Sequence, residues 1–231
     1  MSEGFQSGIF WEAYHDLEKQ LIQFLDYLPY ESGNESAHSY RLLNILSSVG
    51  GYIDSSFKEI RRYEKYSERF DVKEAEIKAK NEELLKEGKY PILFGFGCYL
   101  EVINDIYKII DKKVIFKRLP GRETIEPFRN REWWEIYNST KHDLGKNINL
   151  ANLMNTVTAM GAAFLINAVH EPSILRLYDY DILNSCISRM RIHQSLSESI
   201  PRNLLLEMLK RGQEIPAFLE TDLFIYFYEN E

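Results

Sequence analysis

The stretch of this chain best equipped for chemistry is WWEIYNSTKHD, residues 133–143. If the stretch is helical, residues four positions apart share a face, so Trp134, Asn138 and His142 form one row. A histidine that is neutral near pH 7 can accept or donate a proton, which internal cleavage of RNA requires. Lys141 adds a positive charge suited to a phosphate group. The alternative is a helix end where His142 only caps or packs.

A metal-ligand spacing also occurs twice, as Glu12-x-x-His15 and Glu35-x-x-His38. Di-iron proteins built on four-helix bundles use Glu-x-x-His on two helices, together with one glutamate from each of two further helices. Glu35 belongs to the polar turn ESGNES at a predicted helix start, where the helix dipole favours an acidic residue anyway. We therefore predict no metal site and no cofactor.

The overall charge and the cysteines narrow the class of protein. The 231 residues carry a formal net charge of −7, which disfavours a surface that coats duplex nucleic acid and allows only a local basic groove. Cys98 and Cys186 are too few and too far apart in sequence for a zinc site or a disulfide framework. The opening residues lack the basic start and apolar run of a signal peptide. These features predict a cytoplasmic protein.

One segment is long and apolar enough to raise the question of a membrane. Residues 148–169 form a run of 22 residues without a charge, which is sufficient to cross a bilayer. Asparagine and threonine side chains interrupt this run at Asn149, Asn152, Asn155, Thr156, Thr158 and Asn167. They lower the tendency to insert into lipid, and a buried central helix explains the same pattern. We therefore predict no membrane association.

The spacing of apolar residues predicts a mainly helical chain. The predicted helices cover residues 10–28, 38–70, 98–111, 128–145 and 148–170, and residues 71–88 are predicted to form a charged, solvated helical extension. Two helical patterns follow at 177–194 and 202–212. Residues 112–119 alternate in polarity and could form one short β pair with the tail, 221–231.

These elements predict an all-α fold, an up-and-down helical bundle with a C-terminal helical appendage. We assign residues 1–172 to the bundle and residues 173–231 to the appendage, which would pack on the bundle or on a second subunit. Gly50 and Gly51 lie inside predicted helix 38–70, where each costs about 1 kcal/mol relative to alanine and so needs a reason. We expect a strip of small side chains there to receive another helix. The strip is Ser47, Gly51 and Ser55, and its expected partner is Ala159, Ala162 and Ala163.

Three segments together resemble a known superfamily. They are HSYRLLNILSSVGGYIDSSFKEI (38–60), PFRNREWWEIYNSTKHD (127–143) and NLANLMNTVTAMGAAFLI (149–166). Their WW-x-x-YN-x-x-KH signature is similar to that of uncharacterised prokaryotic proteins near the HEPN superfamily of helical bundles. The resemblance covers roughly residues 36–170. It implies a HEPN-like bundle that forms a homodimer.

The resemblance also implies two kinds of activity. Many HEPN domains are metal-independent ribonucleases of toxin, antiphage and CRISPR systems, and others are inactive binding or assembly modules. Active members carry an arginine, a polar residue and then a histidine on one helix, and the resemblance places Tyr137, Asn138 and His142 at these positions. A phenol lacks the permanent charge and the bidentate phosphate contacts of a guanidinium.

The resemblance further implies residues that support the site. Asp54 and Lys58 are similar to an acidic-then-basic motif on an earlier HEPN helix, which would bring a carboxylate close to His142. Their spacing alone is also typical of a surface row of salt bridges. Trp134 would anchor the helix that carries His142.

Two functions from different classes therefore remain open. The first is a dimeric, non-catalytic module that binds a nucleotide, a nucleic acid or a protein partner through this groove, and the missing arginine favours it. The second is a metal-independent ribonuclease of toxin or antiphage type. In that enzyme His142 would handle the proton, Asn138 would orient the phosphate and Lys141 would offset its developing charge.

Overall fold

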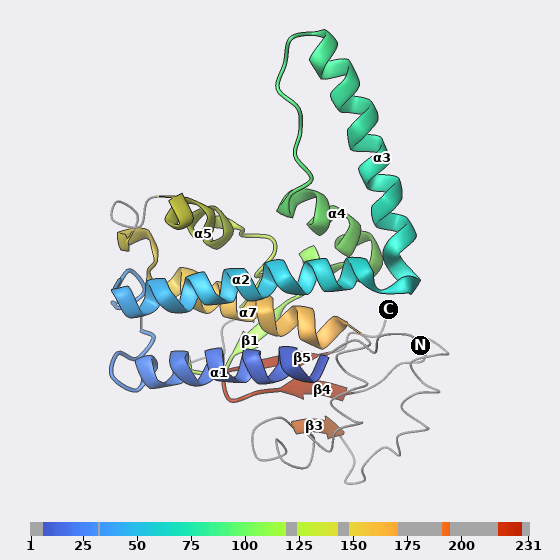
Figure 1. Ribbon diagram of the computed structural model, residues 1–231. Coiled ribbons are helices and arrows are strands. Elements are labelled where there is room, and N and C mark those ends of the chain that lie inside the picture. The colour runs from blue at the N-terminus through green and yellow to red at the C-terminus, as the bar shows by residue number, and fades with distance from the viewer. Residues whose placement is uncertain are drawn as a thin grey trace.

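The structure is a computed structural model that describes residues 7–31, 33–118, 124–142, 148–170, 191–194 and 217–227. It is predominantly helical, with a small antiparallel sheet on one side (Figure 1). Three long helices pack side by side, and a fourth contacts two of them. The three are α1 (Ser7–Leu25), α2 (Tyr40–Arg62) and α7 (Leu153–Val169), and α5 (Glu132–His142) contacts α2 and α7.

The helix starts follow local sequence. Ser39 precedes α2, and its hydroxyl accepts a hydrogen bond from the Leu42 amide at 3.2 Å. Asn152 precedes α7, and its side chain accepts from the Asn155 amide at 2.9 Å. These are N-caps that satisfy amides left open by the first helical turn.

Helix α7 is the uncharged segment, and it is the central helix of the bundle. Its polar side chains bond inside the protein: Asn167 donates to the Ala163 carbonyl at 3.1 Å and accepts from the Tyr52 hydroxyl at 2.7 Å. The Thr156 hydroxyl donates to the Asn152 carbonyl at 2.8 Å. In the part of the chain that the structure describes, no helix combines the length and the apolarity needed to cross a membrane.

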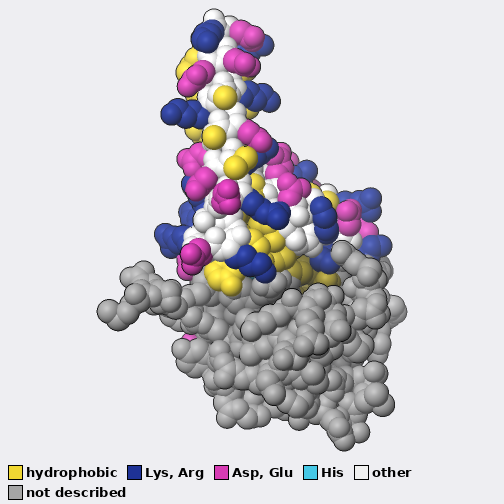
Figure 2. All heavy atoms as spheres, turned by 90° about the vertical axis from the view of Figure 1, so that its right-hand side faces the viewer, with side chains coloured by type: hydrophobic (Ala, Val, Ile, Leu, Met, Phe, Trp, Pro, Cys, Tyr) yellow, Lys and Arg dark blue, Asp and Glu magenta, His cyan; other side chains and the backbone are white. Residues whose placement is uncertain are grey.

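The most unusual feature of the shape is a helical arm, residues 64–95, which stands away from the bundle (Figures 1 and 2). It consists of α3 (Glu64–Lys86), about 35 Å long at 1.5 Å per residue, and a non-helical segment that returns to α4 (Phe96–Tyr107). Gly88 has a φ of +71°, which reverses the chain after the helix. The Asn81 side chain then holds the returning segment, because it donates to the Ile92 carbonyl at 2.8 Å and accepts from the Ile92 amide at 2.6 Å.

Among the described residues, the sheet has five strands in the order β2-β1-β5-β4-β3, and every pair is antiparallel. The strands are β1 (Val114–Phe116), β2 (Thr124–Ile125), β3 (Arg191–Gln194), β4 (Ala217–Glu220) and β5 (Phe224–Phe227). Short 3-10 helices occur at Ile109–Asp111 and Ile148–Leu150. The Phe224 ring stacks on Phe164 of α7 with centroids 5.7 Å apart, so the sheet packs on the central helix.

The structure confirms the predominantly helical fold and the predicted pairing of 112–119 with the tail, since β1 pairs with β5. An all-α fold with at most one β pair was too simple, because that pair belongs to a five-stranded sheet. The helix predicted over 177–194 is wrong at its end: residues 191–194 form β3, where pairing with β4 overrides local propensity. The pattern at 202–212 and the boundary at residue 172 lie outside the described residues.

The helix predicted over 38–70 is two helices. The chain breaks at Tyr63, whose backbone is extended (φ −68°, ψ 119°), and α3 then leaves at a sharp angle (Figure 1). The Tyr63 ring packs edge-on against Tyr66 at 5.5 Å and against His170, after the end of α7, at 5.9 Å. These contacts anchor the break, which we call the elbow. No glycine or proline marks the elbow in the sequence.

Candidate functional site

The signature helix α5 is held by its two tryptophans, and both are buried. Trp133 is fully buried, and its indole N–H donates to the Pro127 carbonyl at 2.8 Å. Trp134 stacks on Phe96 of α4, with ring centroids 3.9 Å apart and planes 16° apart. The aromatic anchor predicted for Trp134 therefore connects α5 to the start of α4.

Tyr137 is buried against α2. Its ring lies directly over Gly50, so that a Cβ atom built on Gly50 would lie 2.4 Å from ring carbons. The neighbouring Gly51 has more room, since its added Cβ would come no closer than 3.8 Å, to the Tyr137 hydroxyl. The glycine at position 50 is thus explained by the aromatic ring of α5. We expected the alanines of α7 to pack against the glycines of α2. The atoms nearest to a Cβ built on Gly50 or Gly51 belong to Tyr137 instead.

The predicted supporting pair lies near the same contact. Lys58 donates to the Asp54 carboxylate at 2.7 Å, and both side chains are partly open to solvent. The pKa of Lys58 is raised, first by this hydrogen bond and the charge of Asp54, and further by the nearby hydroxyls of Tyr99 and Tyr137. Asp54 and Lys58 therefore lie on α2 one and two helical turns beyond Gly50, the residue that Tyr137 covers.

The polar end of α5 is only partly described. Asn138 is half-buried, and Thr140 is buried with its hydroxyl donating to the Tyr137 carbonyl at 2.9 Å. Lys141 and His142 belong to the last turn of α5, but their side chains lie outside the described residues. The two groups that would handle protons and charge in the ribonuclease hypothesis are therefore placed only by their backbone.

This geometry limits what Tyr137 can do chemically. The residue is 4% exposed, and its ring fills the space that a side chain at Gly50 would otherwise occupy. A side chain in that position contributes to packing, and it offers a phosphate no guanidinium-like fork. The burial shows that the Tyr137 ring packs between α5 and α2.

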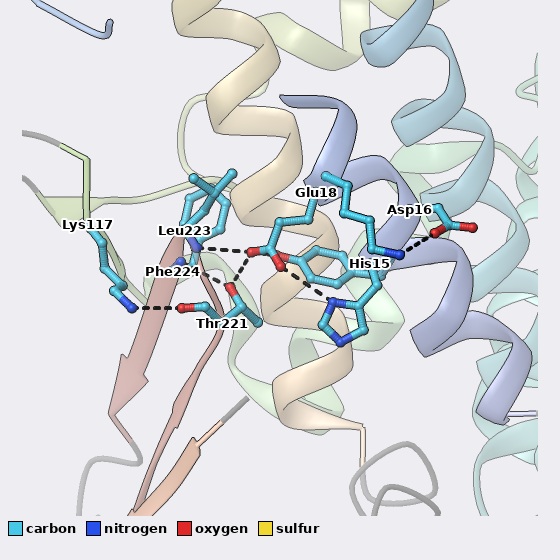
Figure 3. A network of polar contacts seen from close by, with 9 residues as sticks. His15, Asp16, Glu18, Lys117, Thr221, Leu223 and Phe224 are labelled. Carbon is cyan, nitrogen blue, oxygen red and sulfur yellow. Dashed lines mark hydrogen bonds and ion pairs between the residues drawn. The ribbon is translucent and has the colours of Figure 1, made fainter. Parts of the chain in front are cut away.

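A second polar cluster, which sequence reasoning missed, lies between α1 and the sheet (Figure 3). Glu18 is 1% exposed, and its Oε1 atom accepts from the Tyr14 hydroxyl at 3.2 Å and from the Leu223 amide at 3.1 Å. The Thr221 hydroxyl donates to the same oxygen. The Thr221 hydroxyl also accepts from the Phe224 amide at 3.1 Å, so one carboxylate organises the turn before β5. Burial, followed by the charge of Glu18, raises the pKa of Tyr14.

Glu18 also explains one of the two Glu-x-x-His pairs. The His15 Nδ1 atom lies 3.5 Å from the Glu18 carboxylate, and Glu12 is exposed on another face of α1. Among the described residues, no group of three or more histidines, cysteines or acids is arranged to hold a metal ion. A signal was available in the sequence: Glu18 occupies the same helical face as Leu21 and Leu25, where an acid is unexpected.

The third polar feature is a histidine inside the elbow. His170 is 2% exposed, and its Nδ1 atom lies 2.8 Å from the Tyr107 hydroxyl. Burial lowers the pKa of His170 to about 3, so the imidazole is neutral near pH 7. The neutral ring packs edge-on against Tyr63 and Tyr107 and connects the end of α7 to the base of the arm.

Comparisons with family models, with curated proteins and with solved structures find no match to this chain.

Proposed function

We propose that this chain is a non-catalytic, HEPN-like binding module that recognises a protein partner through its helical arm. The resemblance of residues 36–170 supports the HEPN-like bundle, and the exposed side chains of the arm support the recognition element. As the resemblance implies, the module would act as a homodimer. The alternative function is a ribonuclease that uses His142, and an RNA cleavage assay distinguishes the two.

The observation that carries this proposal is the set of apolar side chains that the arm leaves in water. Tyr90 is 93% exposed, Leu93 is 82% exposed and Leu85 is 61% exposed. Leu85 and Tyr90 flank the turn at Gly88, and Leu93 follows on the returning segment, next to Ile92, which Asn81 holds. Figure 2 shows hydrophobic side chains among charged ones along the projecting arm. Single exposed apolar residues are common, but several on one projecting element are typical of an interaction site.

The composition of the arm favours a protein partner over nucleic acid. Acidic and basic residues occur along residues 64–95 in nearly equal numbers, whereas binding to a phosphate backbone needs a surplus of lysine and arginine. The returning segment is also held against α3, because Asn81 makes two hydrogen bonds to Ile92. An ordered element loses less conformational entropy when it binds.

The non-catalytic part of the proposal is tested with RNA. Purified protein is incubated without metal with structured and unstructured RNA, beside the His142→Ala variant, and the oligomeric state is measured on the same samples. We expect no cleavage by the folded dimer. Cleavage that disappears in the variant while the dimer persists would overturn the proposal and establish a ribonuclease that works without the family arginine.

The recognition part is tested by site-specific crosslinking. A photoreactive phenylalanine derivative replaces Tyr90 in one sample and Tyr27 in the other, in cells that make the protein. Tyr27 is the matched control, because it is also a highly exposed tyrosine (86%) but lies beyond the end of α1. We expect one defined adduct from position 90, lost when Leu93→Ser is added, and no such adduct from position 27. Equal adducts from both positions would contradict a role for the arm.

A further inference from the structure

A cleft of about 640 Å³ lies at the base of the arm, between α3 and α4. Its volume falls within the range of ordinary binding pockets. Figure 2 views this side of the molecule and shows hydrophobic side chains at the base of the arm among charges of both signs. The lining comprises Glu68, Arg69, Val72, Lys73, Glu76, Glu101, Val102, Asn104, Asp105 and Ile110.

The charges of the lining are unbalanced. Four carboxylates face two cations, so the lining has a net charge of −2. Lys73 is already bound to Glu101 at 2.7 Å and to Glu76 at 3.4 Å. Glu68 and Asp105, by contrast, make no ion pair with any residue that the structure describes. Arg69 likewise makes no ion pair with a described residue. The cleft therefore offers two carboxylates without an ion pair, one from each wall, beside one such guanidinium, and its net charge stays negative.

The apolar part of the lining faces the same space. Val72 of α3 is 55% exposed, although its neighbour Phe70 is fully buried, and Ile110 is half-buried on the α4 side. Burying such a side chain against a partner contributes free energy in proportion to the apolar area removed from water. An occupant with both apolar and cationic groups would satisfy the two halves of the lining together.

We propose that this cleft binds a basic, amphipathic segment of the partner protein, with its apolar side chains against Val72 and its lysines or arginines against Glu68 and Asp105. The proposal rests on the proposed function, because it assigns the chemistry of the partner that the arm recognises. The negative lining disfavours phosphate-bearing ligands, including RNA and nucleotides. A helical segment is the expected form, since its apolar and cationic residues lie on separate faces.

The test uses two labelled model peptides with the same leucine positions. One carries lysine at every polar position, and the other carries glutamate. Binding to the full-length protein is followed by fluorescence anisotropy in physiological salt, with circular dichroism to confirm that each protein is folded. We expect the lysine peptide to bind with a measurable, saturating Kd and the glutamate peptide to fail. No binding of the lysine peptide, or equal binding of both, would overturn the inference.

A matched pair of double variants separates the cleft from general charge attraction. Glu68→Lys with Asp105→Lys reverses the charge of the two carboxylates that make no ion pair, and Glu12→Lys with Glu31→Lys changes the net charge by the same amount at exposed positions elsewhere. We expect the first pair to weaken binding about tenfold, because two exposed ion pairs are replaced by repulsion, and the second less than about twofold. Equal weakening by both pairs would show that the peptide binds the acidic surface at large and would overturn the inference.

Val72→Ser tests the apolar half without any change of charge. We expect about fivefold weaker binding of the lysine peptide, from the loss of buried apolar area. An unchanged Kd would contradict the proposal that the apolar side chains of the segment pack against Val72. This set of experiments can fail while crosslinking at Tyr90 succeeds, in which case the arm is a recognition element but the cleft is not its pocket.

Discussion

The bundle and the arm are both helical, but they use their residues in opposite ways. Fourteen of the 17 residues of α7 are buried, including polar Asn155, Thr156 and Asn167, whereas only Tyr66 and Phe70 are buried among the 23 residues of α3. Helix α7 is stable because its neighbours cover it. Helix α3 relies on strong helix formers and on charges that water solvates.

As a result, the residue types best suited to chemistry and the exposed apolar side chains of the arm lie in different regions of the molecule. The residues with the most suggestive types, such as Trp133, Tyr137 and Glu18, lie in the bundle, and their polar or aromatic groups are occupied by internal contacts. In the arm, by contrast, large apolar side chains are exposed to solvent, namely Leu85, Tyr90 and Leu93. The tryptophans and Tyr137 of α5 are buried.

The largest effect is expected from Glu18→Ala, which tests whether Glu18 holds the sheet on α1. The substitution leaves the Leu223 amide, the Thr221 hydroxyl and the Tyr14 hydroxyl without their shared acceptor. We expect the free energy of unfolding to fall by about 3 kcal/mol, measured by urea denaturation. Glu12→Ala, at an exposed position of the same helix, should change it by less than about 0.5 kcal/mol. A loss below 1 kcal/mol for Glu18→Ala would show that the cluster does not hold the sheet on α1.

The contact between α2 and α5 is tested by two adjacent glycines. Gly50→Ala places a methyl group 2.4 Å from the Tyr137 ring, so we expect a loss of about 2–3 kcal/mol in the free energy of unfolding from overpacking. Gly51→Ala meets nothing closer than 3.8 Å and should stabilise the helix by up to about 1 kcal/mol. Thermal melting of both variants gives the comparison. The same sign of change in both would contradict the packing described for Tyr137.

The elbow that joins the two regions should be sensitive to acid. The pKa of His170 is lowered to about 3 in the folded protein by burial, while an unfolded histidine has a pKa near 6.5. Between these values the unfolded chain binds the extra proton, so stability decreases as the pH falls from about 6.5 toward 3. From pH 7 to pH 5 we expect a loss of about 2 kcal/mol from this group alone.

The measurement is a series of urea unfolding curves across that pH range for the wild-type protein and for His170→Gln, which cannot titrate. In the variant, the free energy of unfolding should lose the part of its pH dependence that comes from His170 and keep the part that comes from carboxylates. Parallel pH profiles for the two proteins would show that His170 is protonated without penalty, in conflict with its burial.

The smallest effect is expected in the arm. Asn81→Ala removes two hydrogen bonds to Ile92 at exposed positions, so we expect a change of only about 1 kcal/mol or less in global stability. Hydrogen exchange and limited proteolysis within residues 88–95 should nevertheless increase, because this segment opens without the bundle. Increased exchange in α7 as well would mean that the arm and the bundle unfold together.

Several elements were predictable from local pattern alone. The helices predicted over 148–170 and 71–88 follow from apolar spacing and from helix-forming charged residues. The structure contains both with shifted bounds, as α7 (Leu153–Val169) and as the greater part of α3 (Glu64–Lys86). The pairing of β1 with β5 followed from the alternation in residues 112–119 and the apolar tail. The elbow at Tyr63 was not predictable, because it depends on ring contacts with His170, which is distant in sequence.

The candidate site shows the same limit at the level of single residues. Gly50 and Tyr137 were both notable in the sequence. The spacing of residues within one helix, however, does not identify the helix against which it packs. The ring of Tyr137 was expected at a functional groove and lies over Gly50. Glu18 could have been noticed as an acid on an apolar face, yet its partners at residues 221–223 come from the far end of the chain.

By itself, the sequence determined that this chain is mainly helical, that the uncharged run contains a buried helix and that the charged segment 71–88 belongs to a solvated one, because periodicity and charge act over a few neighbouring residues. Only the tertiary structure decided that the tryptophans and Tyr137 of α5 are used for packing, that Glu18 binds the C-terminal strands and that the arm is the exposed element. Those outcomes depend on contacts between segments far apart in the chain, and such contacts have no signature in local spacing.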